Sequence, residues 1–250
     1  MTGLRAHPRR PQARPDSGYQ QKGKQMTKVA VLHTSLVFIS VDPVITDLLK
    51  EELSGAEVAH FVDSDVLSTV IREGSVSEAS ASRMIHLAKA AEAAGADVIL
   101  SACSSLGPAV DLAAAQVGVP IVKIDSAMAA AAARAGDRIG VLATVPTTLG
   151  PTAELVRQKG TEAGRDVSIE TRLAEGAFDA LMSGDRAGHD ETVLAAARDL
   201  ATRVDVIVLA QASMWRMTEA LEAATGKPVL SSPRLGVEDV AQKISSLAGH

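Results

Sequence analysis

A single cysteine, Cys103, stands where a thiol could take part in catalysis. It follows the apolar residues 97–102, and Ser104 and Ser105 come directly after it, just before a predicted helix. The N–H groups and the dipole at the start of a helix favour an anion, so a thiolate is plausible there, and Cys103 could serve as acid, base or nucleophile. The two serines could cap the helix or donate hydrogen bonds to an oxyanion. A lone cysteine can also be a small buried hydrophobic residue, but the polar neighbours favour catalysis.

The segment that carries Cys103 has a counterpart later in the chain. Residues 97–105 (DVILSACSS) match residues 205–213 (DVIVLAQAS), so Gln211 takes the place of the cysteine and Ser213 closes the second copy. Two more pairs of segments match in the same order and at nearly the same spacing: residues 28–34 with 138–144, and residues 119–122 with 227–230. The repeat indicates a duplicated α/β unit whose two copies face each other across paired sites.

His33 ends the first apolar segment and is followed by Thr34 and Ser35. If its ring approached Cys103, an imidazolium could hold the thiolate or relay its proton. A histidine in an apolar strand can also be purely structural. The two hydroxyls could donate hydrogen bonds to a substrate carboxylate, or they could belong to a solvent-facing turn.

Three threonines form a second polar cluster. Thr144, Thr147 and Thr148 precede a helix predicted to begin near residue 150, so their hydroxyls and the adjacent N–H groups form a natural anion site. Capping of that helix would also explain them. Arg216 and Arg234 follow later strands and could clamp a carboxylate, although arginines in a first helical turn are usually solvated.

The elements that must position these residues alternate between strand and helix. Short runs rich in Val, Ile and Leu predict strands at residues 28–33, 57–62, 97–102, 120–124, 138–143, 167–171, 205–210 and 228–231. Alanine-rich helical patterns separate them. Because the strands are continuous apolar runs, we expect mainly parallel sheets covered on both faces.

The repeat sets the expected domain boundaries. Residues 26–125 with 233–250 form the first predicted domain and residues 126–232 the second, as two pseudo-symmetric, Rossmann-like α/β domains. Ligands of open parallel sheets bind beyond the carboxyl ends of the strands. The polar segments should therefore converge in a cleft between the domains, while loops around residues 35–42, 63–75 and 213–217 would select the substrate.

Composition excludes several classes of function. Hydrophobic residues make up 46% of the 250 residues, as in ordinary globular enzymes, while only 2% are aromatic and the net charge is −5, which argues against nucleic-acid binding. No apolar run is long enough to span a membrane and no signal-peptide segment precedes Met26, so a cytoplasmic protein is expected. The chain has no nucleotide-binding glycine motif and no histidine pair at metal-ligand spacing, which predicts no cofactor and no metal.

The N-terminal residues 1–25 differ from the rest of the chain. They contain six basic residues, one acidic residue and three prolines, with few apolar side chains. Such a segment buries too little surface to offset its ordering entropy, so a disordered basic extension is expected. A transit peptide and an upstream start codon, with Met26 as the natural first residue, are the alternatives.

Two motifs resemble those of a known family. The apolar strand followed by residues 102–105 (ACSS), and residues 140–144 (GVLAT) with Thr147 and Thr148, are similar in order and spacing to the aspartate/glutamate racemase superfamily. That superfamily includes hydantoin racemases, maleate isomerases and arylmalonate decarboxylases, and the likeness covers nearly all of residues 26–250. It implies two pseudo-symmetric α/β domains, in which two cysteines act on opposite faces of a substrate α-carbon without a cofactor. It also implies a homo-oligomer.

The chain departs from the family pattern at the second cysteine. Residues 211–213 (QAS) stand where the family usually has Cys-Thr, and His33 stands where glutamate racemases carry an acidic residue. An amide does not transfer protons at a useful pKa, so a symmetrical two-base racemisation loses one base. Arylmalonate decarboxylases offer a precedent for chemistry with one cysteine, although their cysteine resembles the second position.

The leading hypothesis is a cofactor-independent racemase-type or isomerase-type enzyme that moves a proton at the α-carbon of a small carboxylate with Cys103. In it Thr34, Ser35, Thr144 and Thr148 hold the carboxylate, and Gln211 orients the substrate from the opposite face. One alternative is a one-cysteine decarboxylase, and another is a covalent isomerase or hydrolase that uses Cys103 with His33. A small-molecule binding protein on the same fold is the non-enzymatic alternative.

Overall fold

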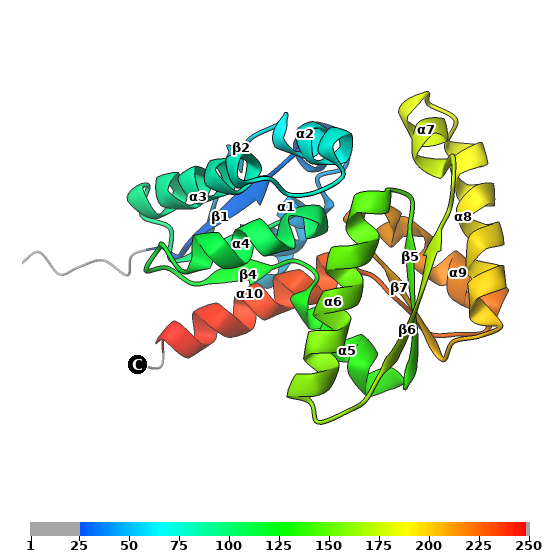
Figure 1. The fold of residues 1–250 in the computed structure, drawn as a ribbon. Coiled ribbons are helices and arrows are strands. Elements are labelled where there is room, and N and C mark those ends of the chain that lie inside the picture. The colour runs from blue at the N-terminus through cyan, green and yellow to red at the C-terminus, as the bar shows by residue number, and fades with distance from the viewer. Residues whose placement is uncertain (1–25, 249–250) are drawn as a thin grey trace, which may run out of the picture.

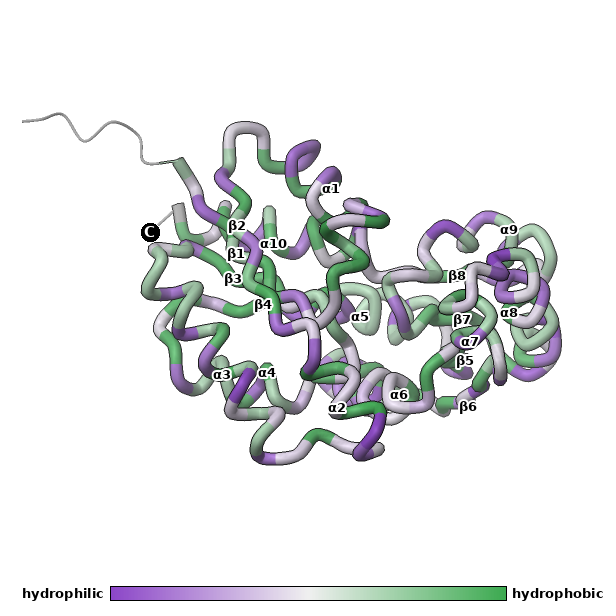
Figure 2. The backbone as a smooth tube through the Cα atoms, turned by 90° about the horizontal axis from the view of Figure 1, so that it is seen from above, coloured by the Kyte–Doolittle hydropathy of each residue, from purple (hydrophilic) through white to green (hydrophobic). Residues whose placement is uncertain are grey.

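The computed structural model describes residues 26–248. The predictions made for residues 1–25 lie outside the described residues. The chain forms two lobes, which Figure 1 shows side by side and Figure 2 shows from above.

Each lobe is built on a four-stranded parallel sheet with the same strand order. The first lobe has the order β2-β1-β3-β4, with β1 (Lys28–His33), β2 (Glu57–Val62), β3 (Val98–Ser101) and β4 (Ile121–Lys123). The second has the order β6-β5-β7-β8, with β5 (Arg138–Ala143), β6 (Ser168–Leu173), β7 (Val206–Leu209) and β8 (Val229–Leu230). The predicted duplication of a parallel α/β unit is confirmed.

Helices cover both faces of each sheet. Those of the first lobe are η1 (a π-helix, Val37–Val41), α1 (Val44–Glu52), α2 (Val66–Glu73), α3 (Glu78–Ala93), η2 (a 3-10 helix, Ser104–Leu106), α4 (Gly107–Ala114) and α10 (Ser232–Ala248). Those of the second lobe are α5 (Ser126–Ala135), α6 (Pro146–Glu162), α7 (Ala177–Met182), α8 (Arg186–Ala201), η3 (a 3-10 helix, Ala212–Met217) and α9 (Thr218–Thr225). The segments expected to be loops around 35–42, 63–75 and 213–217 therefore contain η1, α2 and η3, which corrects that expectation.

The alternation of side chains along the strands explains the layers. Val29 and Val31 of β1 pack with α1 and α10 on one face of the sheet, while Ala30 and Leu32 pack with α2, α3 and α4 on the other. The central strands β1, β3, β5 and β7 are buried along nearly their whole length, as their continuous apolar sequences predict. The edge strands β2 and β6 are more exposed.

The chain crosses between the lobes twice. It leaves the first sheet after β4, forms α5 against the second sheet, and returns after β8 through α10, which packs against α1, β3, β4 and α5. At the start of α10, Gly236 lies so close to the main chain of Ile124 that a Cβ atom at this position would be 2.4 Å from the Ile124 carbonyl oxygen. The second crossing is thus held directly against the first.

Candidate active site

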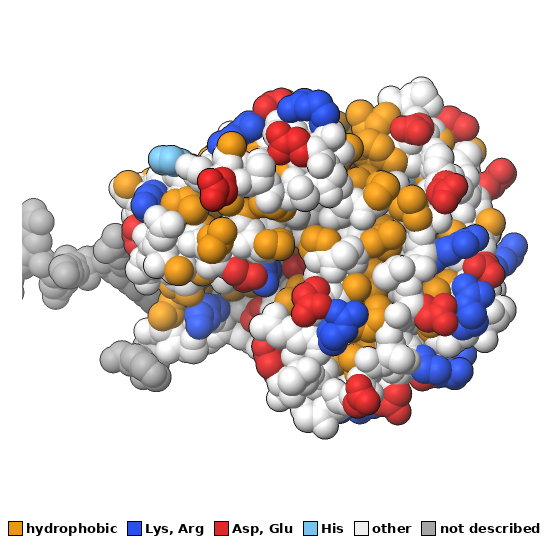
Figure 3. Space-filling view, viewed as in Figure 1, with side chains coloured by type: hydrophobic (Ala, Val, Ile, Leu, Met, Phe, Trp, Pro, Cys, Tyr) orange, Lys and Arg blue, Asp and Glu red, His pale blue; other side chains and the backbone are white. Residues whose placement is uncertain are grey.

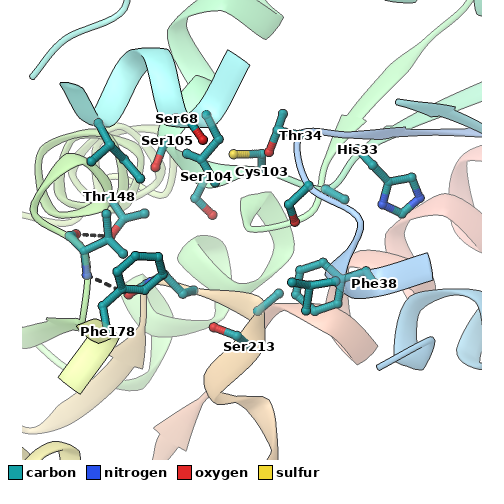
Figure 4. A pocket seen from close by; sticks show the side chains of 18 of the residues that line it. His33, Thr34, Phe38, Ser68, Cys103, Ser104, Ser105, Thr148, Phe178 and Ser213 are labelled. Atoms are coloured by element: carbon teal, nitrogen blue, oxygen red, sulfur yellow. Dashed lines mark hydrogen bonds between the residues drawn. The ribbon is translucent and has the colours of Figure 1, made fainter. Parts of the chain in front are cut away.

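The carboxyl ends of the central strands of both lobes meet at one cavity of about 260 Å³. Most of the polar residues singled out in the sequence line it: His33, Thr34, Ser35, Cys103, Ser104, Ser105, Thr148, Gln211 and Ser213. Thr144 and Thr147 are next to the cavity in sequence but do not line it. Figure 4 shows that Cys103 and its two serines lie across the cavity from Ser213 and Phe178, which come from the second lobe.

Cys103 lies just beyond β3, in extended conformation, with η2 beginning at the next residue. The Thr34 side chain and the N–H groups of Leu106 and Ser105 are donors near the thiol, and each lowers its pKa by favouring the thiolate. Burial outweighs these donors and raises the pKa of the Cys103 thiol, and the nearby Asp125 carboxyl raises it further. The resting group is therefore a protonated thiol. The same donors would stabilise a thiolate formed during the reaction.

His33 is buried at the end of β1 and faces β2. Its Nε2 atom is 3.0 Å from Nδ1 of His60, and its Nδ1 atom finds no hydrogen-bond partner among the described residues. Figure 4 shows the ring turned away from the Cys103 sulfur. Burial, with a smaller contribution from His60, lowers the pKa of His33 to about 4. The predicted imidazolium beside Cys103 is corrected, because the ring is neutral at pH 7 and faces another histidine.

We expect the lowered pKa of His33 to make the fold sensitive to acid. The unfolded chain binds this proton near pH 6.5 and the folded chain only near pH 4, so stability is fully present above pH 6.5 and is lost on acidification toward pH 4. With allowance for solvent screening, the loss attributable to His33 is roughly 2 kcal/mol. This loss of stability is measured by urea unfolding at pH 7 and at pH 4.5. His33→Gln should lose less stability over this interval than the wild type, and a control variant at the exposed His86, His86→Gln, should lose as much. Equal losses in all three proteins would contradict the assignment.

Gln211 is held by the end of β5. Its Oε1 atom accepts hydrogen bonds from the N–H of Thr144 at 2.6 Å and of Val145 at 3.3 Å, and its Nε2 atom donates to Thr144 Oγ1 at 2.9 Å. The side chain of Gln211 thus fills the donor site that was expected to hold a substrate carboxylate. The predicted role of Thr144 in carboxylate binding is corrected, because Gln211 already takes its N–H and hydroxyl groups.

The other two threonines make structural bonds. Thr147 Oγ1 is 3.3 Å from Ser105 Oγ, a contact that joins the two lobes beside the cavity. Thr148 is buried, and its hydroxyl donates to the Val145 carbonyl oxygen at 2.6 Å. Thr148 lines the cavity but its proton is engaged by the main chain. Among the serine hydroxyls that line the cavity, that of Ser105 contacts Thr147, whereas that of Ser213 lies across the cavity from the thiol.

The two candidate arginine clamps are paired elsewhere. Arg216 binds the Asp190 carboxylate, with an Nη1 to Oδ2 distance of 2.7 Å, and Arg234 lies 3.6 Å from carboxylate oxygens of Glu51 and Glu52. Neither arginine lines the cavity. The predicted clamp on a substrate carboxylate is therefore corrected.

Two residues near the thiol were missed by the sequence analysis. Asp125, at the start of α5, is only 3% exposed; burial raises the pKa of its carboxyl, and a hydrogen bond from the Ser104 side chain opposes this shift. Ser68 of α2 lies beside Ser105 and Cys103 in Figure 4. An aspartate before an alanine-rich helix predicts a cap and no more. Nothing in the sequence singled out Ser68, because the helix that carries it, α2, was not predicted.

Two general features of the described residues bear on the site. In residues 26–248, no group of three or more His, Cys, Asp or Glu side chains is arranged to hold a metal ion. Within the same part of the chain, no helix has the length and apolar character needed to cross a membrane.

Comparison with known proteins places this chain in a family. The Asp/Glu/hydantoin racemase model matches residues 43–240. Comparison with curated protein sequences yields no match. Among solved structures, a glutamate racemase from Bacillus anthracis is similar with a TM-score of 0.71 at 13% identity, over 90% of this chain and 83% of that one.

Two other racemase structures share the fold. An allantoin racemase from Pseudomonas fluorescens is similar with a TM-score of 0.58 at 18% identity, over 89% of this chain and 92% of that one. The aspartate racemase of Picrophilus torridus is similar with a TM-score of 0.59 at 13% identity, over 87% of this chain and 94% of that one. Sequence identities this low establish only that the fold is shared. Membership of the family rests on the match to the family model. The chain belongs to the Asp/Glu/hydantoin racemase family.

Proposed function

We propose that the protein is a cofactor-independent enzyme of the racemase type, in which Cys103 transfers a proton at the α-carbon of a small carboxylate. The observation that carries this proposal is the thiol itself, which lines the shared cavity and has the Thr34 side chain and two main-chain N–H groups as nearby donors that favour its charged form. These donors favour a thiolate when the proton leaves. The same group can then take a proton back, as a general acid and base must.

The surroundings of the thiol suit the intermediate of such a reaction. Removing an α-proton from a carboxylate places negative charge on the carboxylate oxygens, and fixed donors lower the energy of that charge. The hydroxyls of Ser104 and Ser105 line the cavity beside Cys103, that of Ser213 lines it on the opposite side, and these three are the candidate donors.

Proton transfer in this site is proposed to be one-sided. Gln211 stands where a second thiol would act, and its amide is bound to Thr144 and Val145. An amide does not exchange protons at a useful pKa. The proton therefore leaves to Cys103 and returns from it, so inversion of the α-carbon requires the planar intermediate to turn its other face to the thiol before the proton returns.

A second candidate function is decarboxylation, favoured by the raised pKa of the Cys103 thiol. Loss of carbon dioxide from a substituted malonate leaves an enediolate, which needs one proton to become the product acid. A protonated thiol supplies that proton and becomes a thiolate, which regains a proton from solvent. By contrast, the position of the His33 ring gives no support to covalent catalysis by a Cys103–His33 pair.

The proposal is tested by proton NMR in D2O on purified protein without added cofactor. The panel contains aspartate, glutamate, hydantoins, 2-phenylpropanoate, maleate and alkyl and aryl malonates. Loss of an α-proton signal supports racemase-type transfer, and conversion of a malonate to its monoacid supports decarboxylation. If every acid is unchanged, proton transfer is rejected and a binding protein on this fold is the better account.

A further inference from the structure

The cavity around Cys103 is lined without charge. Among the described residues that line it, none is Lys, Arg, Asp or Glu, and the one histidine is neutral at pH 7. Nearby charged groups are already paired: Arg216 with Asp190, and Arg83 with Asp63. The buried Asp125 does not line the cavity. A substrate ammonium or second carboxylate would therefore find no counter-ion here.

The entrance to the cavity is apolar and is shared between the lobes. We define the apolar mouth as Phe38 of η1, Leu67 and Ile71 of α2, and Phe178, Leu181 and Met182 of α7. Figure 1 shows α2 and α7 at the same end of the molecule, one on each lobe, and Figure 3 shows hydrophobic side chains gathered between them.

Two residues of the apolar mouth are exposed to an unusual degree. Met182 is 68% exposed and Ile71 is 37% exposed, although both are large apolar side chains. Contiguous exposed apolar groups beside a cavity are typical of a ligand-binding surface. The apolar mouth is therefore a surface that a ligand would cover.

Polar and apolar groups are separated along the cavity. The hydroxyls of Thr34, Ser104 and Ser105 lie on the side of the thiol, whereas Phe38 and Phe178, with Ser213 between them, lie on the opposite side of the view in Figure 4. A ligand that matches both parts of the cavity places a carboxylate near the thiol and an uncharged group at the apolar mouth. Free glutamate or aspartate would instead bury its ammonium and second carboxylate without partners, which is strongly unfavourable.

We propose that the substrate of this site is a carboxylate whose α-carbon bears an uncharged aryl or branched alkyl group, held by the apolar mouth. The inference rests on the proposed function, because it assumes that the carboxylate end lies at Cys103. A cavity of about 260 Å³ is slightly smaller than the pockets that take drug-sized ligands, roughly 300–1,000 Å³. It fits a group of about the size of a phenyl ring.

The first test is binding, measured by titration calorimetry on the wild-type protein with 2-phenylpropanoate, phenylalanine and glutamate. We expect 2-phenylpropanoate to bind at least about 30-fold more tightly than glutamate, because the latter brings two unpaired charges. Phenylalanine, with one unpaired charge, should lie between them. Glutamate binding as tightly as 2-phenylpropanoate, or no heat with any of the three, would overturn the inference.

The second test adds a charge to the apolar mouth. Met182→Arg should raise the affinity for glutamate relative to 2-phenylpropanoate about tenfold, because the guanidinium can pair with the second carboxylate. Leu112→Arg is the matched control, since Leu112 is an exposed leucine of α4 outside the cavity. An unchanged ratio in Met182→Arg, or an equal change in the control, would contradict the role of the apolar mouth.

These binding measurements separate the two proposals. Tight binding of 2-phenylpropanoate without exchange of its α-proton in D2O would support the substrate class and reject the catalytic role of Cys103. Exchange of the α-proton of glutamate, with weak binding of 2-phenylpropanoate, would support the catalytic role and reject the substrate class.

Discussion

Cys103→Ala is expected to slow α-proton exchange of the substrate by about 10²–10⁴-fold, the usual contribution of a positioned proton-transfer group. The structure offers no substitute, because Gln211 is bound to Thr144 and His33 faces His60. The effect should fall on kcat, since the hydroxyls that bind the carboxylate remain. Rates of deuterium uptake by proton NMR, measured over a range of substrate concentrations, separate kcat from KM.

Cys103→Ser is the informative companion variant. Serine keeps a hydrogen-bonding group for Thr34 and for the N–H groups of Ser105 and Leu106, but its hydroxyl ionises far less readily than a thiol. We expect it to lose activity like Cys103→Ala while retaining a similar thermal unfolding temperature. The exposed Ser246→Ala should leave the rate unchanged. A serine variant with near wild-type exchange would show that the thiol is not the proton carrier.

Gly236→Ala is expected to destabilise the fold by about 1–3 kcal/mol, or more, even though alanine is the better helix former by about 1 kcal/mol. The new Cβ atom would lie 2.4 Å from the carbonyl oxygen and 3.0 Å from the Cα atom of Ile124. Main-chain atoms just after β4 cannot rotate away as a flexible side chain can, so α10 must shift. Urea unfolding at pH 7 gives the change in free energy of unfolding.

The control for this variant is on the same helix. Ser245 is exposed on α10, and Ser245→Ala should change the free energy of unfolding by no more than about 0.5 kcal/mol. A Gly236→Ala protein as stable as the Ser245→Ala protein would mean that α10 does not need this close approach.

The strands and most helices of the fold were predictable because each is determined by a short stretch of the sequence. The central strands are short apolar runs such as residues 206–209 (VIVL), and the internal repeat relates each to its partner in the other lobe. By contrast, α2 combines β-branched residues, among them Thr69, with the polar residues Ser68, Arg72 and Glu73 over eight residues, and this mixture favours no single element. The apolar mouth, which depends on α2 and α7, therefore could not be assembled from the sequence.

The errors in the site arose from contacts between distant segments. His33 meets His60 because β1 and β2 pair in a register that sets Val31 opposite His60, which places His60 diagonally across from His33 on one face. Gln211 meets Thr144 because the ends of β5 and β7 adjoin. Both contacts depend on the order of the strands in the sheet, which local sequence patterns do not predict.

The two crossings between the lobes have a mechanical consequence. They lie against each other, because Gly236 at the start of α10 touches the main chain of Ile124 just before α5. Because both crossings lie at one place, a rotation of one lobe relative to the other would have its axis there. Such a rotation would also have to break the Ser105–Thr147 contact and the hydrogen bond from Trp215 to Asp42, which join the lobes elsewhere. The relative position of the two lobes is therefore fixed by contacts on more than one side.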